Sequence, residues 1–173
     1  MKYILEHEVN RGSFGIVYKA RDPDTREPVA VKVVTPSSCG VGSREFELMS
    51  KLDHPSIVKL LSQGQLVLQD ETEEDKELMY GAMEFCSNGD LHSLVSRHKG
   101  MPESVVRGFI VQILEGLKHM DTHGMSHRDL KLENVLLDDD YHAKLCDFGF
   151  ATEDSFSREH YGSKMYISPE NYR

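Results

Sequence analysis

The chain has 173 residues, of which 39% are apolar, so it is long enough to bury the core of one domain of ordinary size. Its formal net charge of −9 argues against a nucleic-acid partner, and its apolar runs are too short to cross a membrane. The N-terminus has no apolar stretch of signal-peptide length, so we expect a cytoplasmic or nuclear protein without a membrane partner. The three cysteines are too scattered for a disulfide framework or a CxxC metal site, which predicts reduced thiols.

The first third of the chain predicts three antiparallel strands followed by a helix. β-Branched and apolar residues, interrupted by a glycine-bearing turn and a polar turn, indicate strands at 4–9, 15–21 and 29–34. Apolar residues then recur at helical spacing at Phe46, Met49 and Leu52 and stop before Pro55. We therefore expect a short amphipathic helix within residues 43–55.

An acidic segment, residues 70–77, lies between two further strand candidates at 65–69 and 77–85. It contains six carboxylates and one lysine. The flanking strands predict a hairpin with this charge at its tip. We interpret the tip as a solvated loop, and the alternative is a docking site for a basic partner.

Residues 102–124 have the clearest helical pattern in the chain. Pro102 begins the pattern and Gly124 ends it. One face collects the apolar residues Val106, Phe109, Ile110, Ile113, Leu117 and Met120. Short strands are expected next, at 134–138 and 143–147, before a polar loop that runs to the end of the chain.

Two features near the N-terminus suggest contact with an anion. Gly12 and Gly15 lie in a predicted turn, where the absence of side chains lets backbone amides approach a polyphosphate. Glycine also serves hairpin turns for its dihedral angles, which is the purely structural alternative. Lys32 stands in the apolar run "VAVKVV" and needs an anion there, for which Glu45 on the next helix is the natural candidate. The alternative is a lysine that faces solvent.

The stretch "HRDLKLEN" places an acid, a lysine and an amide in one loop. Such a loop can turn so that Asp129 faces a hydroxyl, Lys131 a phosphate and Asn134 a metal ion. Asp147 adds a second oxygen ligand before Gly149, which permits a sharp turn. One carboxylate and one amide oxygen, completed by water and phosphate oxygens, suit Mg2+ rather than zinc.

Five motifs together resemble the signature set of eukaryotic protein kinases. In order and spacing these are "NRGSFGIV", "VAVK", "HRDLKLEN", "DFG" and "SPE". The resemblance implies an α+β, two-lobed protein-kinase-like fold. An antiparallel β N-lobe would span residues 1–86 and end in the hinge, and a partial, mostly helical C-lobe would span 87–173. The implied function is transfer of the γ-phosphate of ATP, with Mg2+, to a Ser or Thr hydroxyl of a protein substrate.

The family pattern also assigns roles in phosphoryl transfer. Lys32 contacts the α- and β-phosphates and pairs with Glu45, whereas Asn134 and Asp147 hold Mg2+. Asp129 orients the incoming hydroxyl or accepts its proton, and Lys131 steadies the transferred phosphate. The ATP contacts fall on Val9, Asn10, Gly12, Ser13, Gly15, Val17, Ala30, Lys32, Met83, Glu84, Cys86, Asp90 and Leu136.

Within that set, the family pattern distinguishes the parts of ATP. Met83 matches the gatekeeper, the backbone of Glu84 and Cys86 meets the edge of the base, and Asp90 reaches the ribose. Val17 and Ala30 lie above the adenine and Leu136 below it. The positions that match the stacked spine of active kinases are Met49, Leu60, His127 and Phe148.

Some positions inform the type of kinase. Lys131 and Ser163 fit the serine/threonine type, and the loop sequence resembles the calmodulin-dependent and AMP-activated kinase-like group. In many relatives the acid that matches Glu133 meets an arginine of the substrate, which suggests a basic substrate.

Two positions depart from the pattern. Asn10 replaces the first glycine of the loop, and it is the non-glycine residue best suited to a left-handed turn, so we expect weaker closure over ATP. Glu159 stands where many relatives have a phosphorylated threonine. Paired with Arg128, it would mimic part of a phosphate's charge, with Ser157 as the alternative regulatory site. The alternative is that Glu159 is a solvated loop carboxylate without a regulatory role.

The largest departure is at the end of the chain. Family members continue with further helices, whereas this sequence stops at Arg173, which implies a C-terminally truncated copy. A partner that covers the incomplete C-lobe is then expected. The alternative function is an inactive, pseudokinase-like ATP-binding fragment that regulates a partner. Intact Lys32, Asp129, Asn134 and Asp147 favour the enzyme, and the missing helices favour the alternative.

Overall fold

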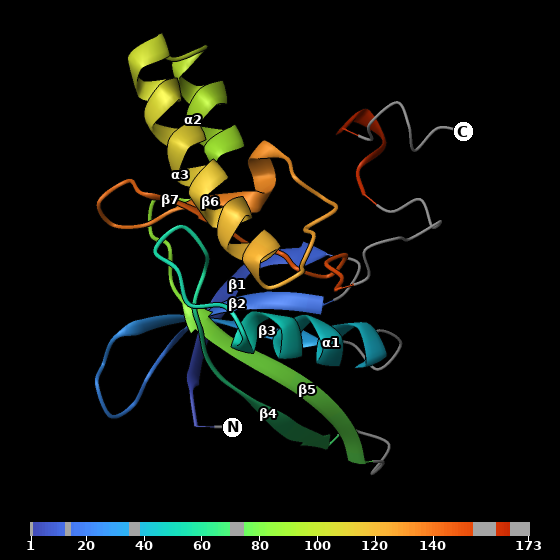
Figure 1. The fold of residues 1–173 in the computed structure, drawn as a ribbon. Coiled ribbons are helices and arrows are strands. Elements are labelled where there is room, and N and C mark those ends of the chain that lie inside the picture. Colours follow the sequence, from blue (N-terminus) through green and yellow to red (C-terminus); the bar gives the residue numbers. More distant parts are fainter. Residues whose placement is uncertain (1, 13–14, 35–38, 70–74, 154–161, 167–173) are drawn as a thin grey trace. The chain divides into compact units, whose positions relative to one another are not determined.

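The computed structural model describes all residues except 1, 13–14, 35–38, 70–74, 154–161 and 167–173 (Figure 1). The chain forms two compact units, Met1–Ser50 with Lys59–Phe85 and Lys51–Val58 with Cys86–Arg173. Residues 51–58 group with the second unit because Ser56 and Val58 make backbone hydrogen bonds with Leu145, at 2.8 and 2.9 Å. The predicted lobes, 1–86 and 87–173, therefore differ from these units at 51–58 and at Cys86, and the lobe division remains a prediction.

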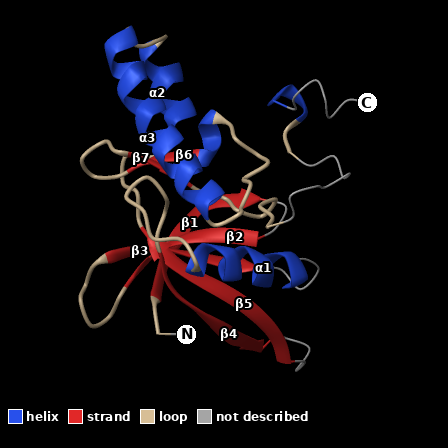
Figure 2. Cartoon of the chain, viewed as in Figure 1, coloured by secondary structure: helices blue, strands red, loops and turns tan. Residues whose placement is uncertain are grey.

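The first unit contains a five-stranded antiparallel sheet, drawn red in Figure 2. Its strands are β1 (Ile4–Gly12), β2 (Gly15–Arg21), β3 (Pro28–Val34), β4 (Leu60–Gln69) and β5 (Asp75–Glu84). Their order in the sheet is β1-β2-β3-β5-β4. The strands predicted from alternating and β-branched residues are confirmed.

Several boundaries of the sheet differ from expectation. β4 begins at Leu60 rather than at residue 65. β1 extends through Asn10, which pairs with Val17, so the prediction that the glycine-bearing turn begins at this residue is wrong. In the acidic hairpin, β5 already begins at Asp75, which pairs with Gln69 of β4. In a run of charged residues the alternation of apolar and polar side chains is lost. The boundary between β5 and the tip of the hairpin could therefore not be predicted from the sequence.

Helix α1 (Cys39–Ser50) lies along one face of this sheet (Figure 1). Phe46 packs over Gly81 of β5, where an added Cβ would be 2.4 Å from the ring. The predicted helix is confirmed, but it begins before residue 43, and Leu52 lies beyond its end. Two glycines at the start of α1, Gly40 and Gly42, are poor helix formers, which hid this beginning in the sequence.

The opposite face of the sheet has its own apolar cluster. It is built from the buried residues Tyr3, Ala20, Val29, Val31 and Ala82. The hydroxyl of Tyr3 forms a hydrogen bond of 2.8 Å with Ser62 Oγ, which joins the chain before β1 to β4. Because β3 is covered on both faces, Lys32 in its middle is withdrawn from solvent.

The second unit is mostly helical. It contains α2 (Leu91–His98), α3 (Glu103–Thr122), the 3-10 turns η2 (Leu132–Asn134) and η3 (Lys164–Tyr166), and the hairpin β6 (Val135–Leu137) with β7 (Ala143–Leu145). The long helix and both short strands are confirmed. Phe109 and Met120 of α3 are buried, whereas Ile110, predicted on the same face, is 50% exposed.

Helix α2 was not predicted from the sequence. Its segment "LHSLVSRH" is short and polar, and only Leu91 is buried. Among the described residues, no helix is long and apolar enough to cross a membrane.

Candidate active site

Lys32 and Glu45 form a buried ion pair in the first unit. Lys32 Nζ lies 2.7 Å from both carboxylate oxygens of Glu45, and the two side chains are 10% and 1% exposed. The sheet register explains the fit, because Lys32 of β3 lies opposite Gly81, which has no side chain to fill this space. The predicted pairing is thus present. A bidentate pair of this kind fixes the direction of the lysine and joins α1 to the sheet.

Lys32 and three other predicted ATP-contacting residues lie on one face of the sheet. Val17 is opposite Lys32, and Ala30 is opposite Met83, so alternation along the strands places them together. This face therefore presents Lys32 among apolar side chains, and Lys19, which is opposite Ala30, lies farther along β2 on the same face. The remaining predicted contacts of the first unit are Val9, Asn10, Gly12, Gly15 and Glu84. Ser13 lies outside the described residues.

In the second unit, the carboxylate of Asp129 is the centre of a hydrogen-bond network. Its Oδ2 accepts from Lys131 Nζ at 2.8 Å and from Asn134 Nδ2 at 2.9 Å, and its Oδ1 accepts from the backbone N–H of Ser163 at 2.7 Å. Lys131 Nζ also donates to Ser163 Oγ at 2.8 Å. The loop residues predicted to act together are therefore in direct contact.

These contacts set the charges of the two ionisable groups. Burial alone would raise the pKa of Asp129, but hydrogen bonds from Lys131 and Ser163 outweigh it and hold that pKa below the ordinary value of 3.8. Burial also acts to lower the pKa of Lys131, yet its hydrogen bond to Asp129 raises it above 10.5. At neutral pH the site therefore contains a carboxylate next to an ammonium.

The β6–β7 hairpin brings Asn134 next to Cys146, the residue that precedes Asp147. Val135 pairs with Leu145, so the residues on either side, Asn134 and Cys146, face each other and share a backbone hydrogen bond of 3.0 Å. The backbone of Asp147 then turns with a φ of 59°. This hairpin explains how two motifs that are separate in the sequence converge.

The orientation of Asn134 suits a cation. Its Nδ2 donates to the backbone oxygen of Asp129 at 2.8 Å and to Oδ2 at 2.9 Å, which leaves Oδ1 as the atom suited to a metal. Among the described residues there is no group of three His, Cys, Asp or Glu side chains with metal-site geometry. An amide oxygen with one carboxylate, Asp147, instead fits Mg2+, which retains water and phosphate ligands.

His127 links the Asp129 loop to Cys146 through hydrogen bonds at both ring nitrogens. Its Nε2 lies 3.0 Å from the backbone oxygen of Cys146, and its Nδ1 accepts from the N–H of Asp129 at 3.3 Å. Burial lowers the pKa of His127 below 6.5, which keeps the ring neutral. Only a neutral ring can donate through one nitrogen and accept through the other. Its ring also packs against Phe148 with centroids 5.2 Å apart.

The predicted ribose contact, Asp90, has a structural task. Its Oδ1 accepts from the N–H of Ser93 at 2.7 Å and its Oδ2 from Ser93 Oγ at 2.8 Å, so it caps the N-terminus of α2. Asp90 also forms a backbone bridge with Leu136, the residue predicted below the adenine. Cys86 begins this stretch of the second unit and is buried.

Arg128 is the one predicted regulatory residue that the structure describes. Its backbone has a φ of 63°, and its Nε donates to the backbone oxygen of Phe150 at 2.6 Å. Glu159 and Ser157 lie outside the described residues, so their predicted pairing with Arg128 is untested.

Ser163 was predicted to mark the serine/threonine type and was not predicted as a residue of the site. Its two contacts with Asp129 and Lys131 show that it belongs there. The separation of more than thirty residues left no local pattern that would have revealed these contacts.

The first unit thus contains an ion-paired lysine on an antiparallel sheet, and the second contains an Asp–Lys–Asn loop. A model of the protein kinase domain family matches residues 3–172. The chain therefore belongs to the protein kinase domain family, as the motifs predicted.

The chain is similar to several curated protein kinases. The chain is 33% identical over 181 residues to the serine/threonine-protein kinase PLK4 of Drosophila grimshawi, 32% over 178 residues to the human NUAK family SNF1-like kinase 1, and 36% over 180 residues to the serine/threonine-protein kinase RAD53 of Saccharomyces cerevisiae. Each match covers 98% of this chain. The chain spans 23, 26 and 21% of the length of these relatives, respectively.

Proposed function

We propose that the chain is the catalytic part of a protein serine/threonine kinase, which transfers the γ-phosphate of ATP to a protein hydroxyl. The observation that supports this most directly is the contact of Asp129 with Lys131, Asn134 and Ser163. A chain without catalytic function has no chemical need for this set of charges. The curated relatives are all kinases by name, and two of the three are named serine/threonine-protein kinases, which supports the same proposal.

Asp129 orients the substrate hydroxyl in this proposal. A carboxylate with a lowered pKa is a weak base, so it accepts the hydroxyl's hydrogen bond first and its proton only late in the transfer. The three donors around Asp129 fix the direction of the carboxylate before substrate binds. Lys131, bonded to both Asp129 and Ser163, lies where its charge can stabilise a phosphoryl group on its way to the hydroxyl.

Asn134 Oδ1 and Asp147 would hold Mg2+. The ion, when bound, neutralises charge on the phosphates of ATP. Lys32, held by Glu45, would bind phosphate oxygens from the first unit. The chain's own contribution is thus to position ATP and the hydroxyl, which phosphoryl transfer chiefly requires.

The side chain of Glu133 is consistent with a basic substrate. It is exposed on η2, one residue before Asn134. An exposed acid so close to the hydroxyl-orienting group is placed to attract an arginine or lysine of the substrate. The proposal that Glu159 substitutes for a phosphorylated residue, through Arg128, stands on sequence alone.

The test is phosphate transfer from γ-labelled ATP to a basic serine peptide in the presence of Mg2+. The matched control is Asp129→Asn, which keeps the shape of the side chain and removes its charge. We expect transfer by the wild-type chain and a loss of about a hundredfold or more in the variant. Equal signals from the two proteins would refute the enzyme. Binding of ATP without transfer would favour the ATP-binding regulatory fragment.

A further inference from the structure

The segment after Asp147 is held at three successive points within the second unit. The backbone oxygen of Phe150 accepts from Arg128, and Thr152 exchanges two backbone hydrogen bonds with Ser126, at 2.8 and 3.0 Å. At the third point, Glu153 Oε1 lies 2.9 Å from Lys51 Nζ. The first two points use backbone groups of the segment. Only the third depends on which side chain the segment presents.

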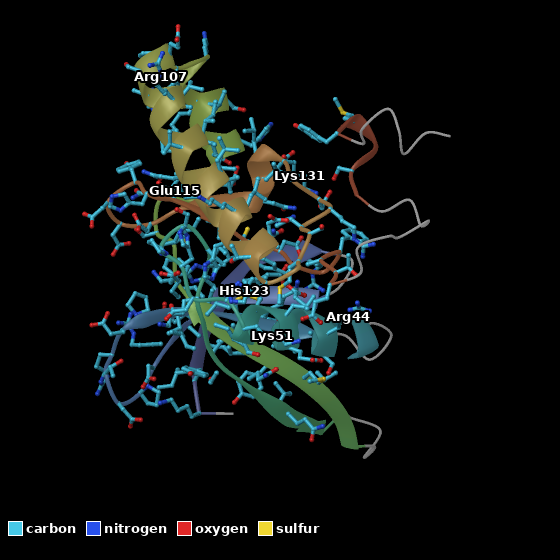
Figure 3. All side chains as sticks on the ribbon, in the orientation of Figure 1. Arg44, Lys51, Arg107, Glu115, His123 and Lys131 are labelled. Atoms are coloured by element: carbon cyan, nitrogen blue, oxygen red, sulfur yellow. The ribbon has the colours of Figure 1, made fainter. Side chains whose placement is uncertain are left out.

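Lys51 has a particular place in the chain. It directly follows Ser50, the last residue of α1, and α1 carries Glu45, the partner of Lys32 (Lys51 is labelled in Figure 3). Glu153 is 102 residues away in sequence, and it is the last residue of the described stretch 147–153. The ion pair therefore connects the chain that leaves α1 to the segment that contains a predicted metal ligand.

We propose that Glu153 is a positioning residue for phosphoryl transfer, because its ion pair with Lys51 holds the segment that carries Asp147 in place. The inference rests on the kinase activity proposed above. In this proposal the carboxylate of Glu153 holds the segment through its ion pair with Lys51.

The expected effect is modest, for a physical reason. The side chains of Lys51 and Glu153 are 38% and 44% exposed, so water and salt screen their attraction. An exposed pair changes an equilibrium by about two- to fivefold. This is too little to determine whether the domain folds, but it is enough to shift a balance between two local arrangements of a segment.

The test compares Glu153→Gln with the charge exchange Lys51→Glu/Glu153→Lys in the full chain. We expect Glu153→Gln to lower kcat by about two- to fivefold with an unchanged midpoint of thermal unfolding, and we expect the exchange to restore most of the loss. The ratio of wild-type to variant kcat should fall toward one when salt is raised from about 0.1 M to about 1 M. The control is Glu103→Gln, which breaks the exposed pair with Arg107 at the start of α3 and should leave kcat unchanged.

A second measurement does not depend on activity. The backbone N–H of Thr152 is bonded to Ser126, so its hydrogen exchange reports whether the segment is held. We expect faster hydrogen exchange at the Thr152 N–H in Glu153→Gln. In the Lys51→Glu/Glu153→Lys protein we expect the same hydrogen-exchange rate as in the wild type. Unchanged exchange in Glu153→Gln, or a loss of kcat that the charge exchange does not restore, would overturn the inference. If the wild-type chain transfers no phosphate, the proposed function fails, and the exchange rates still decide whether Glu153 holds the segment.

Discussion

Asn134 directs its amide nitrogen to Asp129 through two hydrogen bonds, 2.8 Å to the backbone oxygen and 2.9 Å to Oδ2. A single side chain therefore holds both the backbone and the carboxylate of Asp129, and its Oδ1 accepts neither of these bonds. In the proposed mechanism this residue would both position the acid and bind Mg2+.

The first prediction concerns this double task. Asn134→Ala should lower kcat by about a hundredfold and raise the Mg2+ concentration needed for half-maximal rate, because it removes both an oxygen ligand and a donor to Asp129. The measurement is kcat as a function of Mg2+ concentration. Asn88→Ala is the control, since the side chain of Asn88 donates to the backbone oxygens of Asp138 and Asp139 in the same unit. A Mg2+ dependence equal to that of wild type in Asn134→Ala would contradict the metal role.

The second prediction concerns the buried pair of Lys32 and Glu45. Lys32→Met leaves the carboxylate of Glu45 buried without its ammonium partner, so it should lower the free energy of unfolding by about 3 kcal/mol. The double variant Lys32→Met/Glu45→Leu removes both charges and should lose less. Urea denaturation of the three proteins measures this. If the double variant is less stable than Lys32→Met, the cost does not come from the unpaired charge.

The third prediction separates two roles of Asp90. Asp90→Ala removes the cap of α2 and should lower the free energy of unfolding by about 1 kcal/mol. Asp90→Ser keeps a capping oxygen and removes the charge, so it should retain nearly all of that stability. If Asp90 also binds the ribose, both variants should raise the KM for ATP. A wild-type KM in Asp90→Ser would limit Asp90 to the cap.

Some of the site could be predicted because its chemistry is unusual where it stands. A lysine in an apolar strand needs an anion unless it faces solvent, so Glu45 could be named in advance as the candidate partner of Lys32. The loop from Asp129 to Asn134 has all its charges within one short segment, where a local pattern is sufficient. The alternation of side chains likewise located the strands of the sheet.

Other features could not be predicted because nothing in their own segments is unusual. Lys51 and Glu153 are ordinary exposed charges, and only the folded chain brings them together. The sequence assigned Asp90 to the ribose, so its capping of a short polar helix went unnoticed. The glycine-bearing turn was predicted to begin at Asn10, but pairing with Val17 extended the strand through it. For the ion pair and for Asn10, contacts with another segment outweighed local preference.

The last prediction concerns pH and a cluster of histidines at the end of α3. His119 lies between His54 and His123, with ring centroids 5.0 and 4.5 Å away, and its buried Nε2 has no hydrogen-bond partner among the described residues. Burial lowers the pKa of His119 below 6.5, as do His123 and His54, whereas Asp53 acts in the opposite direction. The pKa of His127 is lowered mainly by burial.

Both lowered pKa values have the same consequence for stability. As pH falls below about 6.5, these two histidines bind protons more readily in the unfolded chain than in the folded chain. Proton binding therefore stabilises the unfolded state relative to the folded state. The free energy of unfolding should therefore be highest above pH 6.5 and decrease as pH falls from there toward the lowered pKa values of the folded state. His119→Gln removes one of the two groups and should make this decrease shallower. His92→Gln, on the exposed side of α2, is the matched control and should leave it as in wild type. Urea denaturation between about pH 5 and pH 8 measures the slope, and an equally steep decrease in His119→Gln would show that the histidine cluster does not contribute to it.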